Sequence, residues 1–253
     1  MNLAPKLRQA DEYRNFSAII DRLDLDGPPE LAWIHRAPKR IQSEGKRLGI
    51  FSGSFNPLTV AHAKMIEDSQ AQFGLEEILL CLAKSNVDKD VFGFSLADRL
   101  LMLKRYATQH DEFSVAACSH GRFVDKLRAI KRFYPARTSF HFITGFDTLI
   151  RLFDSKYYTD THAELKSLFD KCDFITANRE EYNTDTIRRF LSTPEVGRYA
   201  GNIKVIELPI DYAAISSTDI REQLERGEPV DDLVPSAISD YIRAARANSS
   251  NEN

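Results

Sequence analysis

Short apolar runs alternate with amphipathic helical segments along the chain from about residue 47 onward. Apolar runs bounded by turn residues are typical of buried strands, and apolar residues at helical spacing are typical of helices. The runs predict strands at 47–52, 77–83, 113–118, 140–144, 173–176 and 203–209. The spacing predicts helices between them, at 60–72, 96–108, 122–133, 147–153, 160–170 and 183–192. This order predicts an α/β fold, a doubly wound parallel sheet with helices on both faces.

The first 45 residues do not follow this alternation. They are charged and helix-favouring, with one break at LDGPPE, so we expect a helical N-terminal extension at 1–45. In this interpretation Leu31, Trp33 and Ile34 dock a second short helix onto the domain.

The C-terminal part is also predicted to be helical. After Ile210 the sequence contains two helical segments separated by a turn at Gly227–Pro229, and it ends in polar residues. Polar chain ends that bury little apolar surface are typically disordered. We therefore expect the main domain at 46–246 and a disordered tail at 247–253.

The stretch GIFSGSFNPLTVAH, from Gly49 to His62, joins the first predicted strand to the first predicted helix. Ligands of open α/β sheets bind where strands end and helices begin. Gly53 allows backbone N–H groups to approach an anion, Asn56-Pro57 turns the chain, and the helix start adds a positive dipole end. His62 lies in the first turn of that helix, where an imidazole can stabilise negative charge. The stretch indicates a phosphate site, although an ordinary capped turn with a surface histidine has the same pattern.

A second predicted helix start has similar chemistry. In ISSTDIR, from Ile215 to Arg221, three successive hydroxyl residues precede an arginine. Ser216 or Ser217 can cap the helix while Thr218, the free N–H groups and Arg221 face an oxyanion. A plain cap with a solvent-exposed arginine is the commoner meaning of such a string alone. Two such starts in one chain favour phosphate binding over two unrelated caps.

Both stretches resemble motifs of the HxGH nucleotidyltransferases. GSFNPLTVAH resembles their GxFxPxHxGH motif, and ISSTDIR resembles their ISSTxIR motif. The similarity is closest to the nicotinamide/nicotinate mononucleotide adenylyltransferases, whose eukaryotic members carry threonine in place of the first histidine. The segment LVPSAISDYIRAA also resembles the end of those enzymes, so the resemblance covers roughly residues 47–246.

The resemblance implies a Rossmann-like nucleotidyltransferase fold and a reaction in NAD biosynthesis. In that reaction a pyridine mononucleotide is joined to the AMP part of ATP, and pyrophosphate is released. ATP and a pyridine mononucleotide are therefore the expected substrates, with Mg²⁺ arriving with ATP.

Individual roles are implied by position in the motifs. His62 and Arg221 match catalytic residues that contact the reacting phosphates. ATP binding is implied for Ser54, Phe55, Thr59, Gly145, Asp147, Arg179, Ser216, Ser217 and Thr218. Mononucleotide binding is implied for Gly53, Lys89, Arg99, His120 and Tyr158. By residue type alone, an aspartate such as Asp147 at a helix start is usually just the N-cap, and Lys89 and Arg99 are equally solvated charges.

The pyridine-binding end departs from the family. Relatives closest in the first motif place tryptophans around the pyridine ring, whereas the single tryptophan here, Trp33, lies outside the matched region. Tyr158, or its neighbour Tyr157, and His120 fall near those positions. An aromatic face that remains there can stack on a cationic ring, although both tyrosines are equally packing residues. The choice between nicotinamide and nicotinate stays open.

Two other functions are compatible with the motifs. One is an HxGH nucleotidyltransferase with a different phosphate acceptor, as in pantetheine-phosphate adenylyltransferases or cytidylyltransferases. The other is a regulator that binds nucleotide without synthesis and uses residues 1–45 as an interaction arm. The missing tryptophans and the threonine at Thr59 favour the regulator, whereas intact His62, Asp147 and Arg221 favour the enzyme.

Composition narrows the class of partner. The formal net charge of −3 gives no general attraction to nucleic acid or to an anionic membrane, so neither is expected as a partner.

The three cysteines form no CxxC pair, the N-terminus lacks a secretory apolar region, and the longest apolar run is too short to span a bilayer. We expect a cytoplasmic protein without a permanent metal site, because no zinc or EF-hand pattern occurs. The oligomeric state is open, a homo-oligomer included.

Overall fold

The computed structural model describes residues 11–85, 93–178 and 182–250. Within them the chain forms a seven-stranded sheet in the order β1-β4-β3-β2-β5-β6-β7. All neighbouring strands are parallel except β1 and β4, so the predicted doubly wound parallel sheet is confirmed. The strands are β1 (Leu31–His35), β2 (Arg47–Gly53), β3 (Glu77–Ala83), β4 (Phe113–Cys118), β5 (Ser139–Gly145), β6 (Asp173–Ala177) and β7 (Ile203–Ile206).

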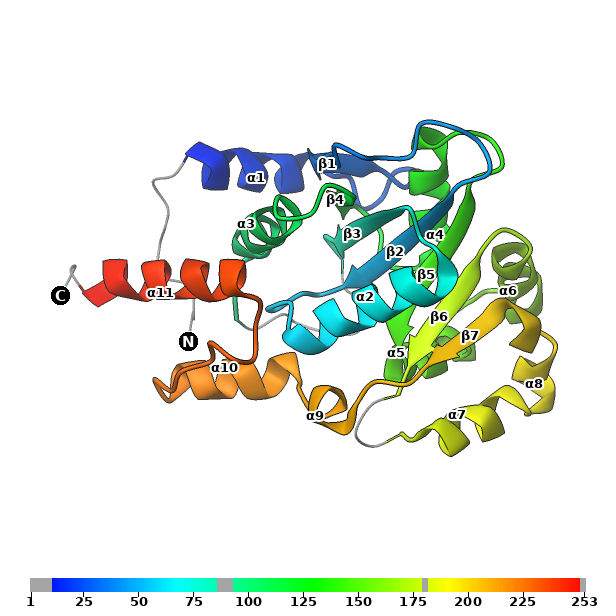
Figure 1. The fold of residues 1–253 in the computed structure, drawn as a ribbon. Coiled ribbons are helices and arrows are strands. Elements are labelled where there is room, and N and C mark those ends of the chain that lie inside the picture. The colour runs from blue at the N-terminus through cyan, green and yellow to red at the C-terminus, as the bar shows by residue number, and fades with distance from the viewer. Residues whose placement is uncertain (1–10, 86–92, 179–181, 251–253) are drawn as a thin grey trace.

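Helices cover both faces of this sheet (Figure 1). They are α1 (Asp11–Arg22), α2 (Val60–Phe73), α3 (Leu96–Ala107), α4 (Phe123–Ile130), α5 (Phe146–Leu152), α6 (Thr161–Phe169), α7 (Thr184–Leu191), α8 (Pro194–Gly197), α9 (Ile210–Ala213), α10 (Ser217–Glu225) and α11 (Ser236–Ser250). The helices predicted between the strands are present with shifts of a few residues at their ends, which is the usual uncertainty of helix boundaries.

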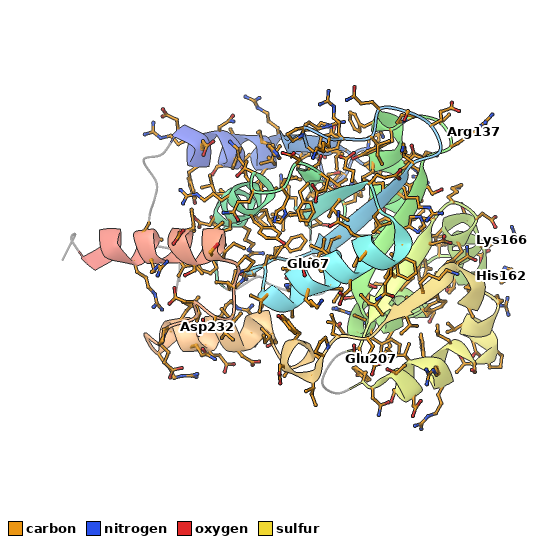
Figure 2. The ribbon with its side chains drawn as sticks, viewed as in Figure 1. Glu67, Arg137, His162, Lys166, Glu207 and Asp232 are labelled. Atoms are coloured by element: carbon orange, nitrogen blue, oxygen red, sulfur yellow. The ribbon has the colours of Figure 1, made fainter. Side chains whose placement is uncertain are left out.

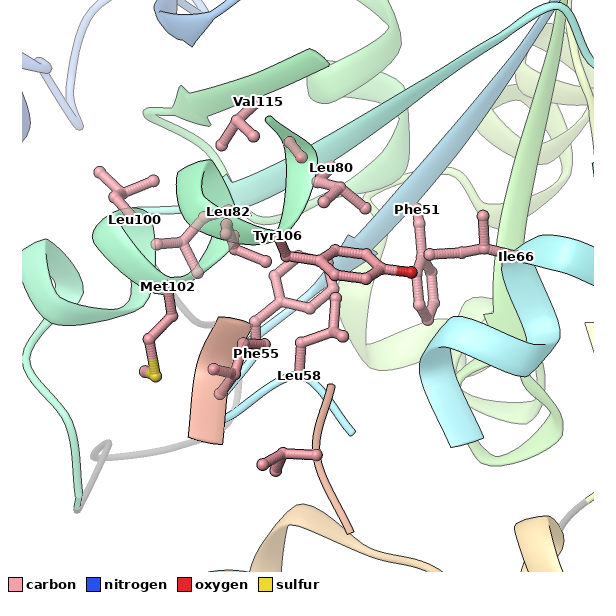
Figure 3. Packing of buried hydrophobic residues seen from close by; sticks show 14 of the residues in the cluster. Phe51, Phe55, Leu58, Ile66, Leu80, Leu82, Leu100, Met102, Tyr106 and Val115 are labelled. Carbon is pink, nitrogen blue, oxygen red and sulfur yellow. The ribbon is translucent and has the colours of Figure 1, made fainter. Parts of the chain in front are cut away.

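Two apolar cores lie on opposite faces of the sheet. On one face, Ile66 of α2, Leu100 of α3 and Tyr241 of α11 belong to one buried cluster. Figure 3 shows the part of this cluster around Tyr106, with Phe51, Phe55 and Leu58 of the β2–α2 segment nearby. On the other face, α4, α5 and α6 contribute to a second buried cluster. The sheet is therefore covered on both faces, as parallel strands require.

The topology places a ligand crevice at the end of β2. The chain runs from β2 to β3 and β4 on one side, and it continues with β5, β6 and β7 on the other side. Strand order reverses between β2 and β5, and their carboxyl ends open a crevice at that point. The loop from Ser54 to Thr59 leaves β2 there and enters α2.

The prediction of a second short helix at Leu31, Trp33 and Ile34 is wrong. These residues form β1, which pairs antiparallel with β4 through Leu31 opposite Cys118 and Trp33 opposite Ala116. The five-residue segment lies between prolines, which leaves too little chain for a stable helix. Pairing with the unpaired edge of β4 therefore decides its conformation.

Both ends of the described chain pack against α3 (Figure 1). Asp98, buried in the first turn of α3, accepts hydrogen bonds from the Ser95 backbone N–H and from the Tyr241 hydroxyl of α11 at 2.7 Å. The Tyr13 hydroxyl of α1 lies 3.2 Å from the Ser95 hydroxyl. The start of α3 is thus braced by α1 and by α11, which extends to Ser250 and so into the segment predicted as a tail.

Tyr241→Phe should lower the free energy of unfolding by about 1.5–3 kcal/mol, because one oxygen of the buried Asp98 carboxylate loses its donor. Chemical denaturation followed by circular dichroism measures this change. Tyr212→Phe is the matched control, because the Tyr212 hydroxyl forms no hydrogen bond within the described ranges. Equal stability of the two variants would contradict the bracing role of Asp98.

Candidate functional site

A cavity of about 480 Å³ lies at the carboxyl ends of β2, β3 and β5. Most of the residues predicted from the two motifs meet in its wall, together with Gly145, Asp147 and Tyr158. The lining includes Gly53, Ser54, Phe55, His62, Gly145, Asp147, Tyr158, Ser216, Ser217, Thr218 and Arg221. Lys89 and Arg179 lie outside the described residues, so their predicted roles stay predictions. Thr59, Arg99 and His120 do not line the cavity.

Thr59 fixes His62 instead of facing the cavity. Thr59 is fully buried and caps α2, with its hydroxyl accepting the His62 backbone N–H at 3.2 Å. In return, the Thr59 backbone N–H donates to Nδ1 of His62 at 3.0 Å. Because Nδ1 accepts this hydrogen bond, a neutral His62 carries its proton on Nε2. The histidine therefore enters the site as a hydrogen-bond donor of fixed orientation.

The two helix starts are joined by hydrogen bonds to main-chain carbonyls. The Ser217 hydroxyl donates to the Pro57 carbonyl at 2.9 Å, and Arg221 Nη1 donates to the Asn56 carbonyl at 2.9 Å. Arg221 also donates to the Ser217 carbonyl within α10. The start of α10 is thereby held against the loop that begins α2, so two positive helix ends belong to one cavity.

Arg99 supports the loop from below. Its side chain is only 1 % exposed, and its guanidinium donates to the Phe94 carbonyl and, at 3.4 Å, to the Ser54 carbonyl. Since the C=O and the N–H of a trans peptide point in opposite directions, this contact turns the Phe55 N–H away from Arg99. The structure therefore gives Arg99 a contact with the loop backbone, while its predicted contact with the mononucleotide stays a prediction.

The charge around the loop is positive. Burial, with repulsion from Arg221, lowers the pKa of Arg99 to about 10, and burial also lowers the pKa of Arg221. Within the described ranges neither guanidinium forms an ion pair with a carboxylate, although at longer range Asp98 acts on Arg99, and Glu222, Glu225 and Asp219 act on Arg221. Two arginines without a carboxylate partner at the ends of two helices favour a bound anion.

Gly93 is required where α3, the loop and α10 approach one another. Its φ is +117°, a conformation that favours glycine. A Cβ at this position would lie 2.7 Å from Cδ of Arg221 and 2.8 Å from Oδ1 of Asn56. Oδ1 of Asn56 accepts the Phe94 N–H at 3.0 Å, so its position is fixed as well.

The other wall of the cavity comes from α4, α5 and the segment after α5. Asp147 does not cap α5, because the N-cap is Gly145; its carboxylate pairs with Arg151 at 3.1 Å. Both side chains of this pair are almost half exposed, so the pair costs little to open for a ligand.

The aromatic part of the cavity wall contains no tryptophan. Phe123, Tyr157 and Tyr158 line the cavity, whereas Trp33 packs on Phe133 and beneath Arg36 near β1. The Tyr158 hydroxyl donates to the Leu152 carbonyl at 2.5 Å, which holds its ring in the wall. Nδ1 of His120 lies 2.7 Å from the Ser119 hydroxyl, outside the lining.

The sequence analysis missed three cationic side chains of the lining, Arg122, Lys126 and Arg151. Arg122 and Lys126 lie four residues apart at the start of α4, which follows β4. A signal was present, because ligand-binding residues of an open α/β sheet follow the carboxyl ends of strands. No phosphate-type motif accompanies them, so residue patterns alone did not single them out.

A seven-stranded α/β sheet with two helix starts that face one cavity at its switch point is typical of nucleotide-binding proteins. The chain belongs to the cytidylyltransferase-like family, whose family model matches residues 50–223. The motif-based resemblance to a nucleotidyltransferase is therefore confirmed.

The relatives agree with this family. The chain is 28% identical over 221 residues to a putative nicotinamide mononucleotide adenylyltransferase of Schizosaccharomyces pombe, covering 81% of this chain and 87% of the relative. It is 27% identical over 207 residues to a probable nicotinate-nucleotide adenylyltransferase of Moorella thermoacetica, covering 78% of this chain and 89% of the relative.

A solved structure has the same fold. The nicotinic acid mononucleotide adenylyltransferase of Plasmodium falciparum, complexed with NaAD, matches with a TM-score of 0.59 and 20% identity, covering 82% of this chain and 98% of that one. At this identity the match supports the fold alone. Separately, no helix in the described ranges has the length and apolarity needed to cross a membrane.

Gly93→Ala should weaken binding of a nucleoside triphosphate by about tenfold or more, because the added methyl displaces Arg221 and Asn56. Calorimetric titration with ATP measures the dissociation constant. Gly201→Ala is the control, since a Cβ there meets nothing within 4 Å. Unchanged ATP affinity in a folded Gly93→Ala variant would show that this junction does not shape the site.

Proposed function

We propose that this protein is an adenylyltransferase that joins a pyridine mononucleotide, nicotinamide or nicotinate, to the AMP part of ATP and releases pyrophosphate. The observation that carries the proposal is the pair of hydrogen bonds from Ser217 and Arg221 to the Pro57 and Asn56 carbonyls. They bring both helix starts to one cavity, where a triphosphate can reach both. The names of the Schizosaccharomyces pombe and Moorella thermoacetica relatives support a pyridine mononucleotide as acceptor.

The reaction needs positioning and charge stabilisation more than covalent chemistry by the protein. A phosphate oxygen of the mononucleotide attacks the α-phosphorus of ATP, forming a P–O bond. The bond between the α-phosphorus and the bridging oxygen to the β-phosphorus breaks, and pyrophosphate leaves with that electron pair. Arg221, the Nε2–H of His62 and the helix-start N–H groups offset the negative charge that develops.

The cavity fits Mg²⁺ that arrives bound to ATP. Two carboxylates line it, Asp147 and Glu164, and each is already paired with an arginine at 3.1 Å. In the described part of the chain, no cluster of three or more His, Cys, Asp or Glu side chains could hold a metal ion. Phosphate oxygens and water would thus supply most ligands of the ion, which adds charge neutralisation on the triphosphate.

We place the reaction in the cytoplasm, which the three free buried cysteines support.

Incubation with ATP, Mg²⁺ and each mononucleotide in turn tests the proposal. We expect pyrophosphate release together with a dinucleotide product when a pyridine mononucleotide is present. Pantetheine phosphate and CTP with a phosphate acceptor serve as comparison reactions. ATP binding without turnover of any acceptor would contradict the proposal and favour a nucleotide-binding regulator.

His62→Ala should lower turnover by about 100- to 1000-fold, because one oriented donor to the developing charge is lost. Steady-state kinetics with saturating ATP measures the change, and thermal unfolding checks that the variant folds. His162→Ala is the control, since His162 lies exposed on α6 at the outer surface (Figure 2). Near-normal turnover of His62→Ala would remove His62 from the mechanism.

A further inference from the structure

Lys126 brings a buried positive charge into the wall of the cavity. It lies in the first turn of α4 and is only 6 % exposed, yet it lines the cavity. Its ammonium donates to the Gly121 carbonyl at 2.5 Å and lies 5.2 Å from the centre of the Phe123 ring. A buried ammonium is costly unless an anion compensates it.

No carboxylate of the described residues forms an ion pair with Lys126. Its neighbour Asp125 pairs with Arg122 at 2.9 Å. Behind the ammonium, Cys81 and Cys118 are buried on β3 and β4. These thiols and Asp125 act on the ammonium electrostatically, yet burial lowers the pKa of Lys126, because the charged form is desolvated.

The ammonium lies at the aromatic part of the cavity. Phe123 forms this part with Tyr158, and Arg122 connects the two segments by donating to the Tyr157 carbonyl at 3.3 Å. If the phosphate of an acceptor points toward the loop, its ring can lie between Phe123 and Tyr158, and the ring substituent can then reach the start of α4, where Lys126 lies.

The two candidate acceptors differ in charge only at that substituent. Nicotinate carries a carboxylate and nicotinamide carries a neutral amide, while both rings are cationic in the mononucleotide. The carboxylate offsets the repulsion between the cationic ring and the ammonium, whereas the amide does not. Arg122 cannot substitute for Lys126 as freely, because Asp125 and Glu164 already neutralise its guanidinium.

We infer that Lys126 recognises the ring carboxylate of the acceptor, so that this site prefers nicotinate mononucleotide over nicotinamide mononucleotide. This inference rests on the proposed adenylyltransferase function. Lys126 is then a specificity-determining residue that the motifs do not contain.

The test compares kcat/KM for the two mononucleotides in the native protein and in Lys126→Met. The native protein should favour nicotinate mononucleotide, and the variant should lower that preference on the order of 10- to 100-fold, the usual effect of a charged hydrogen bond. Lys131→Met, just after α4 and exposed, is the matched control and should keep the native preference. Lys126→Arg keeps the charge and should retain most of the preference.

The outcomes separate the two proposals. Turnover of both mononucleotides with a preference that Lys126→Met does not change would overturn the role of Lys126 and leave the adenylyltransferase function standing. A native preference for nicotinamide mononucleotide would overturn it in the same way. No turnover of either mononucleotide by the folded native protein would overturn the proposed function and this inference with it. If Lys126→Met does not fold, Lys126→Gln answers the same question with a polar side chain.

Discussion

The shape of the site depends on hydrogen bonds to three main-chain carbonyls of the loop between β2 and α2, those of Ser54, Asn56 and Pro57. Arg99, Arg221 and Ser217 donate these bonds from α3 and α10. Because Arg99 engages the Ser54 carbonyl, the N–H of the same peptide, that of Phe55, points away from Arg99 and can face a ligand. The same contacts bring the starts of α2 and α10 together, although Pro57 and Ser217 are 160 residues apart in sequence.

The rest of the molecule supports these contacts. Tyr13 of α1 and Tyr241 of α11 meet the start of α3 at Ser95 and Asp98, next to Arg99. The two ends of the described chain therefore stabilise the helix that carries the arginine under the loop. The guanidiniums of Arg99 and Arg221 remain without a carboxylate partner in the described ranges, and this positive charge is balanced when an anion binds.

The sequence predicted the strands and helices of the main domain because their apolar periodicity reflects burial along whole elements. It did not predict β1, since Leu31–His35 becomes a strand only by pairing with β4. The motifs in the sequence predicted that His62 and Arg221 share one site. They could not show that Thr59 and Arg99 are buried beneath the loop, because burial depends on the tertiary packing. Lys126 was missed for the same reason: its importance lies in its burial at the cavity wall.

The central claim is that one triphosphate contacts both helix starts. A crystal structure of the protein with Mg²⁺ and a non-hydrolysable ATP analogue tests this claim most directly. We predict phosphate oxygens within hydrogen-bond distance of His62 and the loop N–H groups on one side and of Thr218 and Arg221 on the other. A triphosphate that contacts only one of the two helix starts, or binds outside this cavity, would contradict the claim.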